Sequence, residues 1–128
     1  MRVLLDTHVT LWAAAEPERL GSSAALLLEA DERWLSAAST WEMPIKQGLG
    51  KLDLGADAGA WTTRALEALA ARPLPLTHAH AAAVERLPPV HRDPFDRVLV
   101  AQAQVEGLVL LTADATLAAY GTAVHVLG

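Results

Sequence analysis

Val-Leu-Leu-Asp-Thr-His, residues 3–8, is the stretch of the chain that decides its fold class. Three apolar residues end at a polar stop, and this pattern predicts a short buried strand. Residues 108–114, which read Leu-Val-Leu-Leu-Thr-Ala-Asp, repeat the arrangement with an acid just past the apolar run. Both stretches therefore predict a strand that brings a carboxylate, Asp6 or Asp114, to its carboxyl end.

Strands and helices alternate outward from this stretch along the whole chain. The alternation favours an α/β fold with a parallel sheet, covered on both faces by helices and joined by right-handed crossovers. In such sheets the ligand site lies beyond the carboxyl ends of the strands. The expected strands are 3–5, 33–35, 74–76, 108–111 and 124–126, and the expected helices are 8–15, 22–30, 39–47, 58–71, 78–86, 94–106 and a short one after Asp114.

The bulk composition limits the class of protein. A chain of 128 residues fits a single domain spanning 1–128. The absence of cysteine excludes disulfides, a thiol nucleophile and a thiolate zinc site. No apolar run is long enough to cross a bilayer and no signal peptide is visible, so we expect a cytoplasmic protein. The formal net charge of −5 argues against a broad nucleic-acid surface, although bound divalent metal would offset it locally.

Four acids stand in short polar breaks of this apolar chain, namely Asp6, Glu42, Asp96 and Asp114. Each follows a predicted strand or lies near the start of a predicted helix, so one cleft at the edge of the sheet would collect all four. Two like charges about 4 Å apart repel by roughly 4 kcal/mol at an effective dielectric of 20. A divalent cation is the simplest way to offset that repulsion, and the acids therefore point to metal-assisted chemistry.

Helix capping is the alternative interpretation of these acids, and the sequence alone leaves it open. Residues 39–42, Ser-Thr-Trp-Glu, have the pattern of a capping box that would use Glu42. Pro44 removes a backbone donor from the same helix, and the expected kink would move Glu42 relative to the cleft. Asp93 precedes a proline and is the natural N-cap of its helix. We therefore expect Asp96 to be a ligand and Asp93 to be a cap or a supporting acceptor.

Other polar side chains near the acids are candidates for supporting roles. Thr7 and Thr112 would orient ligands or water, with ordinary turn or capping roles as the alternative. Lys46 and Arg97 would contact substrate phosphates, with surface or ion-pair roles as the alternative. Lys51 and Arg92 are weaker candidates for the same contact, His8 and His91 are candidates for the mouth of the cleft, and Trp12 and Trp41 are candidates for partner contacts or core packing.

Motifs of several other enzyme classes are absent. The histidines do not have the H-E-x-x-H spacing of zinc hydrolases, and there is no G-x-S-x-G nucleophile elbow. Neither a P-loop nor a G-x-G-x-x-G turn is present. The sequence therefore gives no support for a serine hydrolase or a nucleotide-binding fold.

Together these segments resemble the PIN-domain ribonucleases, and within them the VapC toxins of toxin–antitoxin pairs. The resemblance covers nearly the whole chain. Its most specific stretch is 87–97, Leu-Pro-Pro-Val-His-Arg-Asp-Pro-Phe-Asp-Arg, followed by Ala-Gln-Ala at 101–103. The other matching segments are 4–8 with Leu11 and Trp12, 39–42 with Ile45 and Lys46, 50–52, and 110–114.

The resemblance implies a three-layer α/β/α sandwich with a mainly parallel central sheet and an acidic pocket that binds Mg²⁺, with Mn²⁺ as a substitute. The family's acids fall on Asp6, Glu42, Asp96 and Asp114, which we expect to be both catalytic residues and metal ligands. The implied activity is that of an endoribonuclease, which hydrolyses single-stranded RNA with metal-activated water. The implied partners are RNA, a cognate antitoxin that occupies the site, and a second copy of the chain. No membrane is implied.

Two other functions remain open on the sequence. One is an RNA- or protein-binding module of the same fold with little or no activity, which only Pro44, a departure from the family pattern, favours. The other is a metal-dependent phosphatase, since such an enzyme would use similar carboxylate ligands. The sequence also leaves open whether the pocket holds one ion or two.

Overall fold

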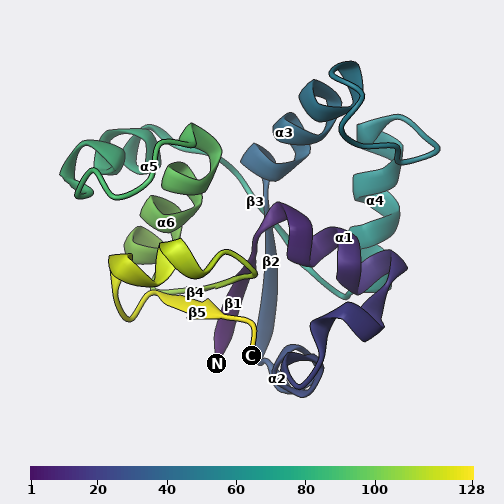
Figure 1. Ribbon diagram of the computed structural model, residues 1–128, viewed down its shortest axis with the longest axis horizontal. Helices are drawn as coiled ribbons and strands as arrows, with labels where there is room; N and C mark the ends of the chain where they lie inside the picture. Colours follow the sequence, from purple (N-terminus) through teal and green to yellow (C-terminus); the bar gives the residue numbers. More distant parts are fainter.

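The computed structural model describes all of residues 1–128 and has a five-stranded sheet at its centre (Figure 1). The strand order is β3-β2-β1-β4-β5, and every neighbouring pair is parallel. This confirms the expected α/β fold with a parallel sheet. The strands are β1 (Arg2–Leu5), β2 (Glu32–Ser36), β3 (Arg72–Leu74), β4 (Val109–Thr112) and β5 (Val124–Val126).

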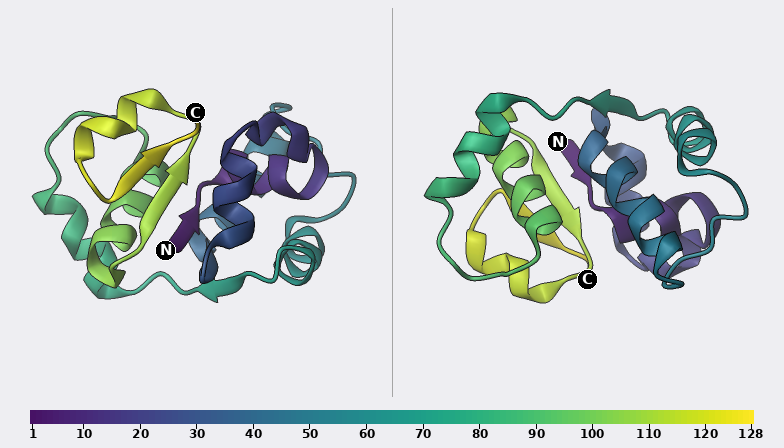
Figure 2. Two further views of the ribbon diagram at one scale, coloured as in Figure 1. Left: turned by 90° about the horizontal axis from the view of Figure 1, so that it is seen from below. Right: turned by 90° about the horizontal axis from the view of Figure 1, so that it is seen from above.

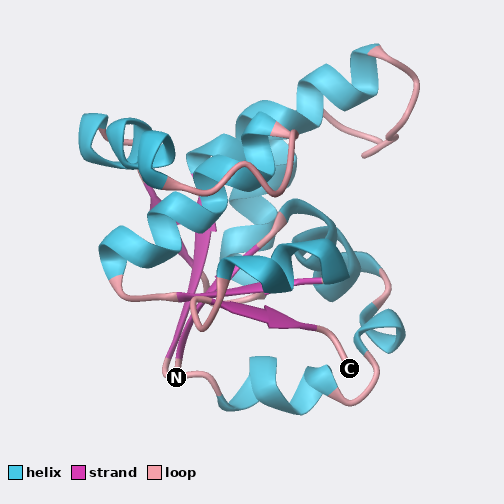
Figure 3. Ribbon diagram, turned by 60° about the vertical axis from the view of Figure 1, so that its left-hand side comes forward, coloured by secondary structure: helices cyan, strands magenta, loops and turns pink.

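Helices cover both faces of this sheet, as the two views of Figure 2 and the colouring of Figure 3 show. The α-helices are α1 (Thr7–Ala15), α2 (Ser23–Glu29), α3 (Ala37–Gly48), α4 (Ala58–Ala68), α5 (His78–Ala83) and α6 (Pro94–Glu106). Three short 3₁₀ helices complete the chain, namely η1 (Pro17–Leu20), η2 (Val84–Arg86) and η3 (Ala115–Tyr120). No helix is long and apolar enough to cross a membrane.

Two hydrophobic cores lie on opposite faces of the sheet, because successive side chains of a strand point in opposite directions. In β1, Leu4 joins the core that contains residues of α6, β4 and η3. Its neighbours Val3 and Leu5 join the core that contains residues of α1 and α2. All three side chains are fully buried. The central strand is therefore apolar on both faces, which is why its first polar residue marks the edge of the sheet.

Helix α6 begins and ends where the sequence predicts. Asp93 is its N-cap and accepts hydrogen bonds from the backbone N–H groups of Phe95 and Asp96. A proline occupies the first helical position, where its missing N–H costs nothing. The helix ends at Gly107, which has a left-handed φ of 67° that a glycine adopts without strain.

The start of α3 differs from the expectation. The helix begins at Ala37, and its N-cap is Ser36, whose Oγ accepts a hydrogen bond from the N–H of Ala38. The capping-box interpretation of residues 39–42 is therefore wrong, because Ser39 already lies in the third helical position. Helix α3 also continues to Gly48 through Pro44, so the proline does not break the segment that carries Glu42.

Three further expectations need correction. The third strand occupies 72–74 and not 74–76, because α4 ends at Ala68 and the chain turns at Ala70, which has a φ of 49°. Helix α2 occupies 23–29 and not 22–30, and the hydroxyl of Ser22, its N-cap residue, donates to the carbonyl of Gly128 and makes no capping hydrogen bond. The 3₁₀ turn η1 was not expected.

Candidate functional site

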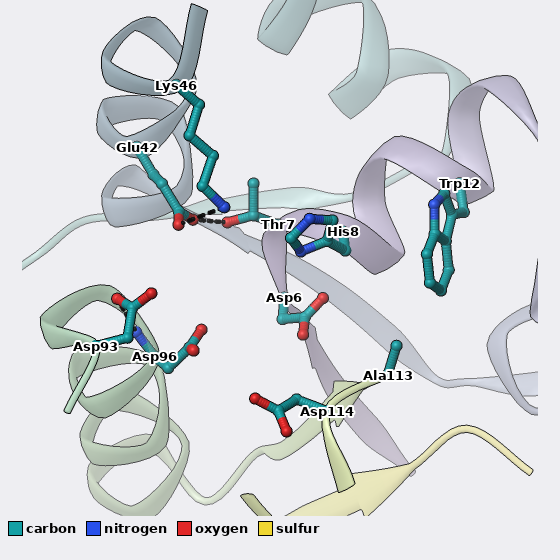
Figure 4. A pocket seen from close by; sticks show the side chains of 10 residues that line it. All are labelled: Asp6, Thr7, His8, Trp12, Glu42, Lys46, Asp93, Asp96, Ala113 and Asp114. Carbon is teal, nitrogen blue, oxygen red and sulfur yellow. Dashed lines mark hydrogen bonds and ion pairs between the residues drawn. The ribbon is translucent and has the colours of Figure 1, made fainter. Parts of the chain in front are cut away.

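A cavity of about 340 Å³ opens at the carboxyl ends of β1 and β4 (Figure 4). The four acids singled out by the sequence come together there from four separate elements, and Asp93 joins them. The cavity lies where ligand sites of parallel α/β sheets are found. Its lining residues are Asp6, Thr7, His8, Trp12, Glu42, Lys46, Asp93, Asp96, Ala113 and Asp114.

Asp6 is the most deeply buried of the aspartates, with 5% of its surface exposed. Its backbone N–H donates to the carbonyl of Leu111, which fixes Asp6 beside the end of β4. The carboxylate accepts hydrogen bonds from the N–H of Val9 and from the hydroxyl of Thr112. Burial raises the pKa of Asp6 above its ordinary value, although both hydrogen bonds oppose the rise. No cationic side chain pairs with this carboxylate.

Thr112 connects the two strand-end acids. Its buried hydroxyl donates to Asp6 and accepts a hydrogen bond of 3.0 Å from the backbone N–H of Asp114. Asp114 itself is the N-cap of η3, and its Oδ1 accepts from the N–H and the hydroxyl of Thr116. The hydrogen bonds from Thr116 lower the pKa of Asp114. A single hydroxyl thus fixes the side chain of one acid and the backbone of the other.

Asp96 lies in the first turn of α6, and His91 reaches it from the preceding loop. The Nε2 of His91 is 2.7 Å from Asp96 Oδ2 and 3.6 Å from Asp114 Oδ2. Burial is the main reason that the pKa of Asp96 is raised to about 6, and the nearby charge of Asp93 adds to the rise. The hydrogen bond from His91 opposes it. Ligand atoms of His91, Asp96 and Asp114 lie within 4.8 Å of one another, which is close enough to share one cation.

Glu42 is held at the side of the cavity by two polar neighbours. It is 3% exposed, and its Oε1 accepts a hydrogen bond of 2.6 Å from the hydroxyl of Thr7. Its Oε2 forms an ion pair of 3.0 Å with Lys46 Nζ, one helical turn further along α3. Figure 4 shows both contacts. Lys46 therefore lies at the cavity, as expected of a substrate contact, but it is paired with an acid of the pocket.

Arg97 is placed differently from the expectation. Its guanidinium donates to the carbonyls of Pro88 and Val84 and to the hydroxyl of Tyr120, at 3.0, 3.3 and 3.1 Å, and it does not line the cavity. It also contacts the carbonyl of His91 at 3.4 Å. Arg97 therefore holds the loop that carries His91, and its position gives no support to a contact with substrate.

The chemistry of the donors fits a hard divalent cation. Carboxylate oxygens are the ligands that Mg²⁺ and Mn²⁺ prefer. The only lysine or arginine in the lining is Lys46, and Glu42 already engages it. Burial raises the pKa values of Asp6 and Asp96, and a bound cation would favour the charged form of both carboxyl groups. Asp6, Asp96 and Asp114, with Glu42 beside them, are the residues that would hold an ion.

Comparisons with known proteins agree with the fold and identify its family. A family model described as the PIN domain matches residues 3–122. Ribonuclease VapC22 of Mycobacterium tuberculosis is 34% identical over 114 residues, which are 88% of this chain and 86% of that protein.

Several solved structures have the same fold. VapBC2 from Rickettsia felis, bound to a DNA fragment from its promoter, aligns with a TM-score of 0.72 at 12% identity over 100% of both chains. A toxin–antitoxin complex from Klebsiella pneumoniae aligns with a TM-score of 0.67 at 19% identity over 98% of both. FitAcB from Neisseria gonorrhoeae aligns with a TM-score of 0.63 at 23% identity over 95% of both. These similarities establish the fold.

Proposed function

The chain belongs to the PIN-domain family, and we propose that it is a metal-dependent endoribonuclease that acts as the toxin of a toxin–antitoxin pair. The observation that carries the proposal is the meeting of Asp6, Glu42, Asp96 and Asp114 in one cavity from four separate elements. Its similarity to a ribonuclease supports RNA as the substrate. The hard oxygen donors support Mg²⁺ as the ion, with Mn²⁺ as a substitute.

The four acids have different roles in this proposal, according to their positions. Asp6, Asp96 and Asp114 line the cavity from the ends of β1 and β4 and from α6, and they would hold the principal ion, while Glu42 completes the pocket from α3. When bound, a divalent cation activates water and stabilises the negative charge that develops on a phosphate during hydrolysis. Water would attack the phosphorus in line with the leaving oxygen, so the phosphodiester bond breaks and the leaving oxygen takes up a proton.

The residues around the acids have supporting roles in this proposal. Thr112 fixes the carboxylate of Asp6, and Thr7 fixes that of Glu42. Asp93 caps α6 and so orients the turn that carries Asp96. Lys46 contacts Glu42 in the free protein and would neutralise a phosphate that enters beside it. Arg97 acts indirectly, since it anchors the loop of His91.

A cognate antitoxin is the expected protein partner. Structures of the same fold include toxin–antitoxin complexes. A cavity that contains five acids and one lysine would also attract a cationic side chain of such a partner. The two reading frames on either side of this gene would supply candidates, and co-purification of one of them with this chain would test the expectation.

A homodimer is the second expected assembly, and an apolar surface supports it. Trp41, Ile45 and Leu76 are 60%, 41% and 40% exposed, and they line a mostly apolar cavity of about 650 Å³ together with Phe95 of α6. Exposed apolar groups gathered in one place mark interaction surfaces. Light scattering should give the mass of a dimer, and Trp41→Asp should give that of a monomer. A dimer that survives this substitution would place the contact elsewhere.

The proposed activity is tested by cleavage of single-stranded RNA with Mg²⁺ or Mn²⁺. We expect cleavage that EDTA abolishes, and we expect Asp6→Asn to lower the rate at least about a hundredfold, because it removes a central ligand. Glu67→Gln, at an exposed acid of α4 that lines none of the cavities described here, is the matched control and should cleave as the wild type does. Equal rates for the wild type and Asp6→Asn would disprove the assignment.

A small phosphomonoester distinguishes the phosphatase alternative. If it is hydrolysed and RNA is not, the acids hold metal for a different reaction. If metal binds and neither substrate is hydrolysed, the chain is a binding module of the same fold.

A further inference from the structure

A second cavity adjoins the acidic one, between α1, η1, α4 and the loop at 51–54. Its volume is about 510 Å³, within the range of about 300–1,000 Å³ that ligand sites occupy. His8, Trp12 and Lys46 line both cavities. In Figure 4, Trp12 lies on the side of the acidic pocket away from Asp93 and Asp96. A ligand that fills the acidic pocket can therefore continue into this groove, which we call the α1–α4 groove.

Two tryptophans contribute to the lining of the α1–α4 groove. Trp12 comes from α1, and the guanidinium carbon of Arg19 lies over its ring, 4.2 Å from the ring centroid. Trp61 comes from α4 and is half-buried, and its ring has no aromatic or cationic partner within the protein. The face of an indole ring is a platform on which a nucleic-acid base stacks, whatever the identity of the base.

The lining of the α1–α4 groove contains three cationic side chains, Arg19, Lys46 and Lys51, and two acidic ones, Glu16 and Asp53. Lys46 and Lys51 are the only lysines of the chain, and both line the groove. Lys51 is exposed and takes part in no ion pair. Glu16 forms an ion pair with Arg19 at 3.2 Å, whereas the exposed Asp53 keeps its charge, since it accepts only a hydrogen bond from a backbone N–H of its own loop. In a chain with a net charge of −5, this placement of both lysines beside the acidic pocket favours an anionic ligand.

A third cavity, of about 360 Å³, adjoins the acidic pocket through Glu42, Lys46 and Asp93. Lys51 and Arg92 also line it, but it contains no tryptophan. The acidic pocket thus has cationic neighbours in both adjoining cavities, but tryptophans in only one of them. The aromatic ring of the third cavity, Phe95, already packs edge-on against Trp41, with ring centroids 5.0 Å apart. A linear polyanion with flat bases matches this arrangement, with its reacting phosphate at the acids and an unstacked base in the α1–α4 groove.

We propose that the α1–α4 groove is a base-stacking subsite for single-stranded RNA next to the scissile phosphate. Trp61 is the stacking platform, and Lys51 contacts a phosphate of the same strand. The inference rests on the proposed ribonuclease function and assigns residues that select the substrate. Duplex RNA does not fit this subsite, because its bases already stack within the helix. A protein segment would use the apolar part of the groove but would leave the unpaired Lys51 without a counterpart.

Binding to Asp6→Asn protein, in which cleavage is suppressed, tests the stacking. The probes are fluorescein-labelled single-stranded RNA 12-mers of each base and a duplex of the same length, with Mg²⁺ present. In the Asp6→Asn protein, the second substitution Trp61→Leu keeps the apolar bulk of the side chain but removes its aromatic face. It should weaken the binding of single-stranded RNA at least about fivefold. Trp61→Phe, which keeps an aromatic face, should stay within about twofold. Melting temperatures of both variants check that they fold.

Salt dependence tests the contact of Lys51. Lys51→Gln should reduce the slope of log Kd against log salt concentration by roughly 0.7, the value for one phosphate contact on a single strand. Arg64→Gln, at an exposed residue of α4 that lines none of the three cavities, should leave the slope unchanged. An equal slope for Lys51→Gln and the parent would overturn this contact.

Cleavage of RNA by protein that is otherwise wild type distinguishes a failure of the stacking subsite from a failure of the proposed ribonuclease function. Trp61→Leu should raise KM for single-stranded RNA and change kcat little, because the tryptophan lies outside the acidic pocket. If the wild type cleaves no RNA with Mg²⁺ or Mn²⁺, the proposed function fails. If it cleaves and Trp61→Leu neither weakens binding nor raises KM, the stacking subsite alone fails, and the α1–α4 groove belongs to a protein partner.

Discussion

Thr112 is the residue on which the geometry of the two strand-end acids depends most. Its hydroxyl is fully buried and serves Asp6 as donor and the backbone of Asp114 as acceptor. Thr112→Val keeps the shape but leaves both groups without that partner. We expect a loss of about 1–3 kcal/mol in the free energy of unfolding, measured by urea denaturation of metal-free protein, together with weaker binding of Mn²⁺.

Thr63→Val provides the control for this substitution. The hydroxyl of Thr63 donates to a carbonyl on the exposed surface of α4, so its removal should cost less than about 0.5 kcal/mol and leave metal binding unchanged. If both valine variants lost equal stability, the hydroxyl of Thr112 would have no special role.

Asp96 makes the stability of the metal-free protein depend on pH. Its pKa is raised to about 6 in the folded chain, against an ordinary value of 3.8. Between these values the unfolded chain releases a proton that the folded chain retains, so folding stability falls as pH rises. Metal-free protein should therefore be more stable at pH 5 than at pH 7 through this group. Asp6, whose pKa is raised as well, acts in the same direction.

Urea denaturation in chelator at the two pH values measures this effect. Asp96→Asn should reduce the gain in stability between pH 7 and pH 5, and at pH 7 it should be neutral or stabilising, because it removes a poorly compensated charge. Glu67→Gln should show the wild-type dependence. If Asp96→Asn kept the full pH dependence of the free energy of unfolding, the effect would not come from the buried carboxyl group of Asp96.

The residues of the site differ in how far a sequence pattern can reveal them. Asp6 follows its apolar run directly and Asp114 lies three residues past Leu111, so local pattern and strand topology suffice to bring them together. The contact of His91 with Asp96 depends on a loop that Arg97 and Tyr120 fix through hydrogen bonds to its backbone. Those partners lie on other elements, and no local pattern contains them. For the same reason the sequence predicts for Arg97 a contact with substrate, or a surface or ion-pair role, and not its hydrogen bonds to this loop.

At the scale of elements, α3 shows why a helix start is hard to place from sequence. Ser36 and Ser39 both fit the pattern of an N-cap. Ser36 is the N-cap because β2 ends there and passes directly into α3. Its hydroxyl oxygen accepts a hydrogen bond from the N–H of Ala38, and the hydroxyl donates to Gln102 in the core. The tertiary contact decides between two equal local signals. The boundaries of α6 were predicted correctly, because a proline after an N-cap residue marks the start of a helix and a glycine that can adopt a left-handed φ marks its end.

Pro44 offers a prediction that belongs to this helix. A proline inside a helix removes one backbone hydrogen bond and costs roughly 3 kcal/mol in a regular helix. Helix α3 runs through it, and Glu42 still lines the acidic pocket. Pro44→Ala should therefore raise the free energy of unfolding by about 1–2 kcal/mol and leave the rate of RNA cleavage within about twofold.

Gly48→Ala is the comparison for Pro44→Ala. Gly48 is the last residue of the same helix, and a Cβ there meets nothing within 4 Å. It should give a smaller gain, of about 0.5–1 kcal/mol, through helix propensity alone. If Pro44→Ala changed cleavage strongly while Gly48→Ala did not, the proline would be part of the machinery that positions Glu42.

At the scale of the whole molecule, the fold gathers five acids around one cavity whose lining contains a single lysine, so a bound metal ion should stabilise the folded chain as a unit. A ligand at about one hundred times its Kd adds roughly 2.7 kcal/mol to the free energy of unfolding. Saturating Mg²⁺ should therefore raise the Tm of the wild type and of Glu67→Gln by several degrees, and should raise those of Asp6→Asn and Asp96→Asn much less. Calorimetry with and without Mg²⁺ measures these shifts. Equal shifts in all four proteins would mean that the ion binds elsewhere on the molecule, and the acidic pocket would then have to be explained without it.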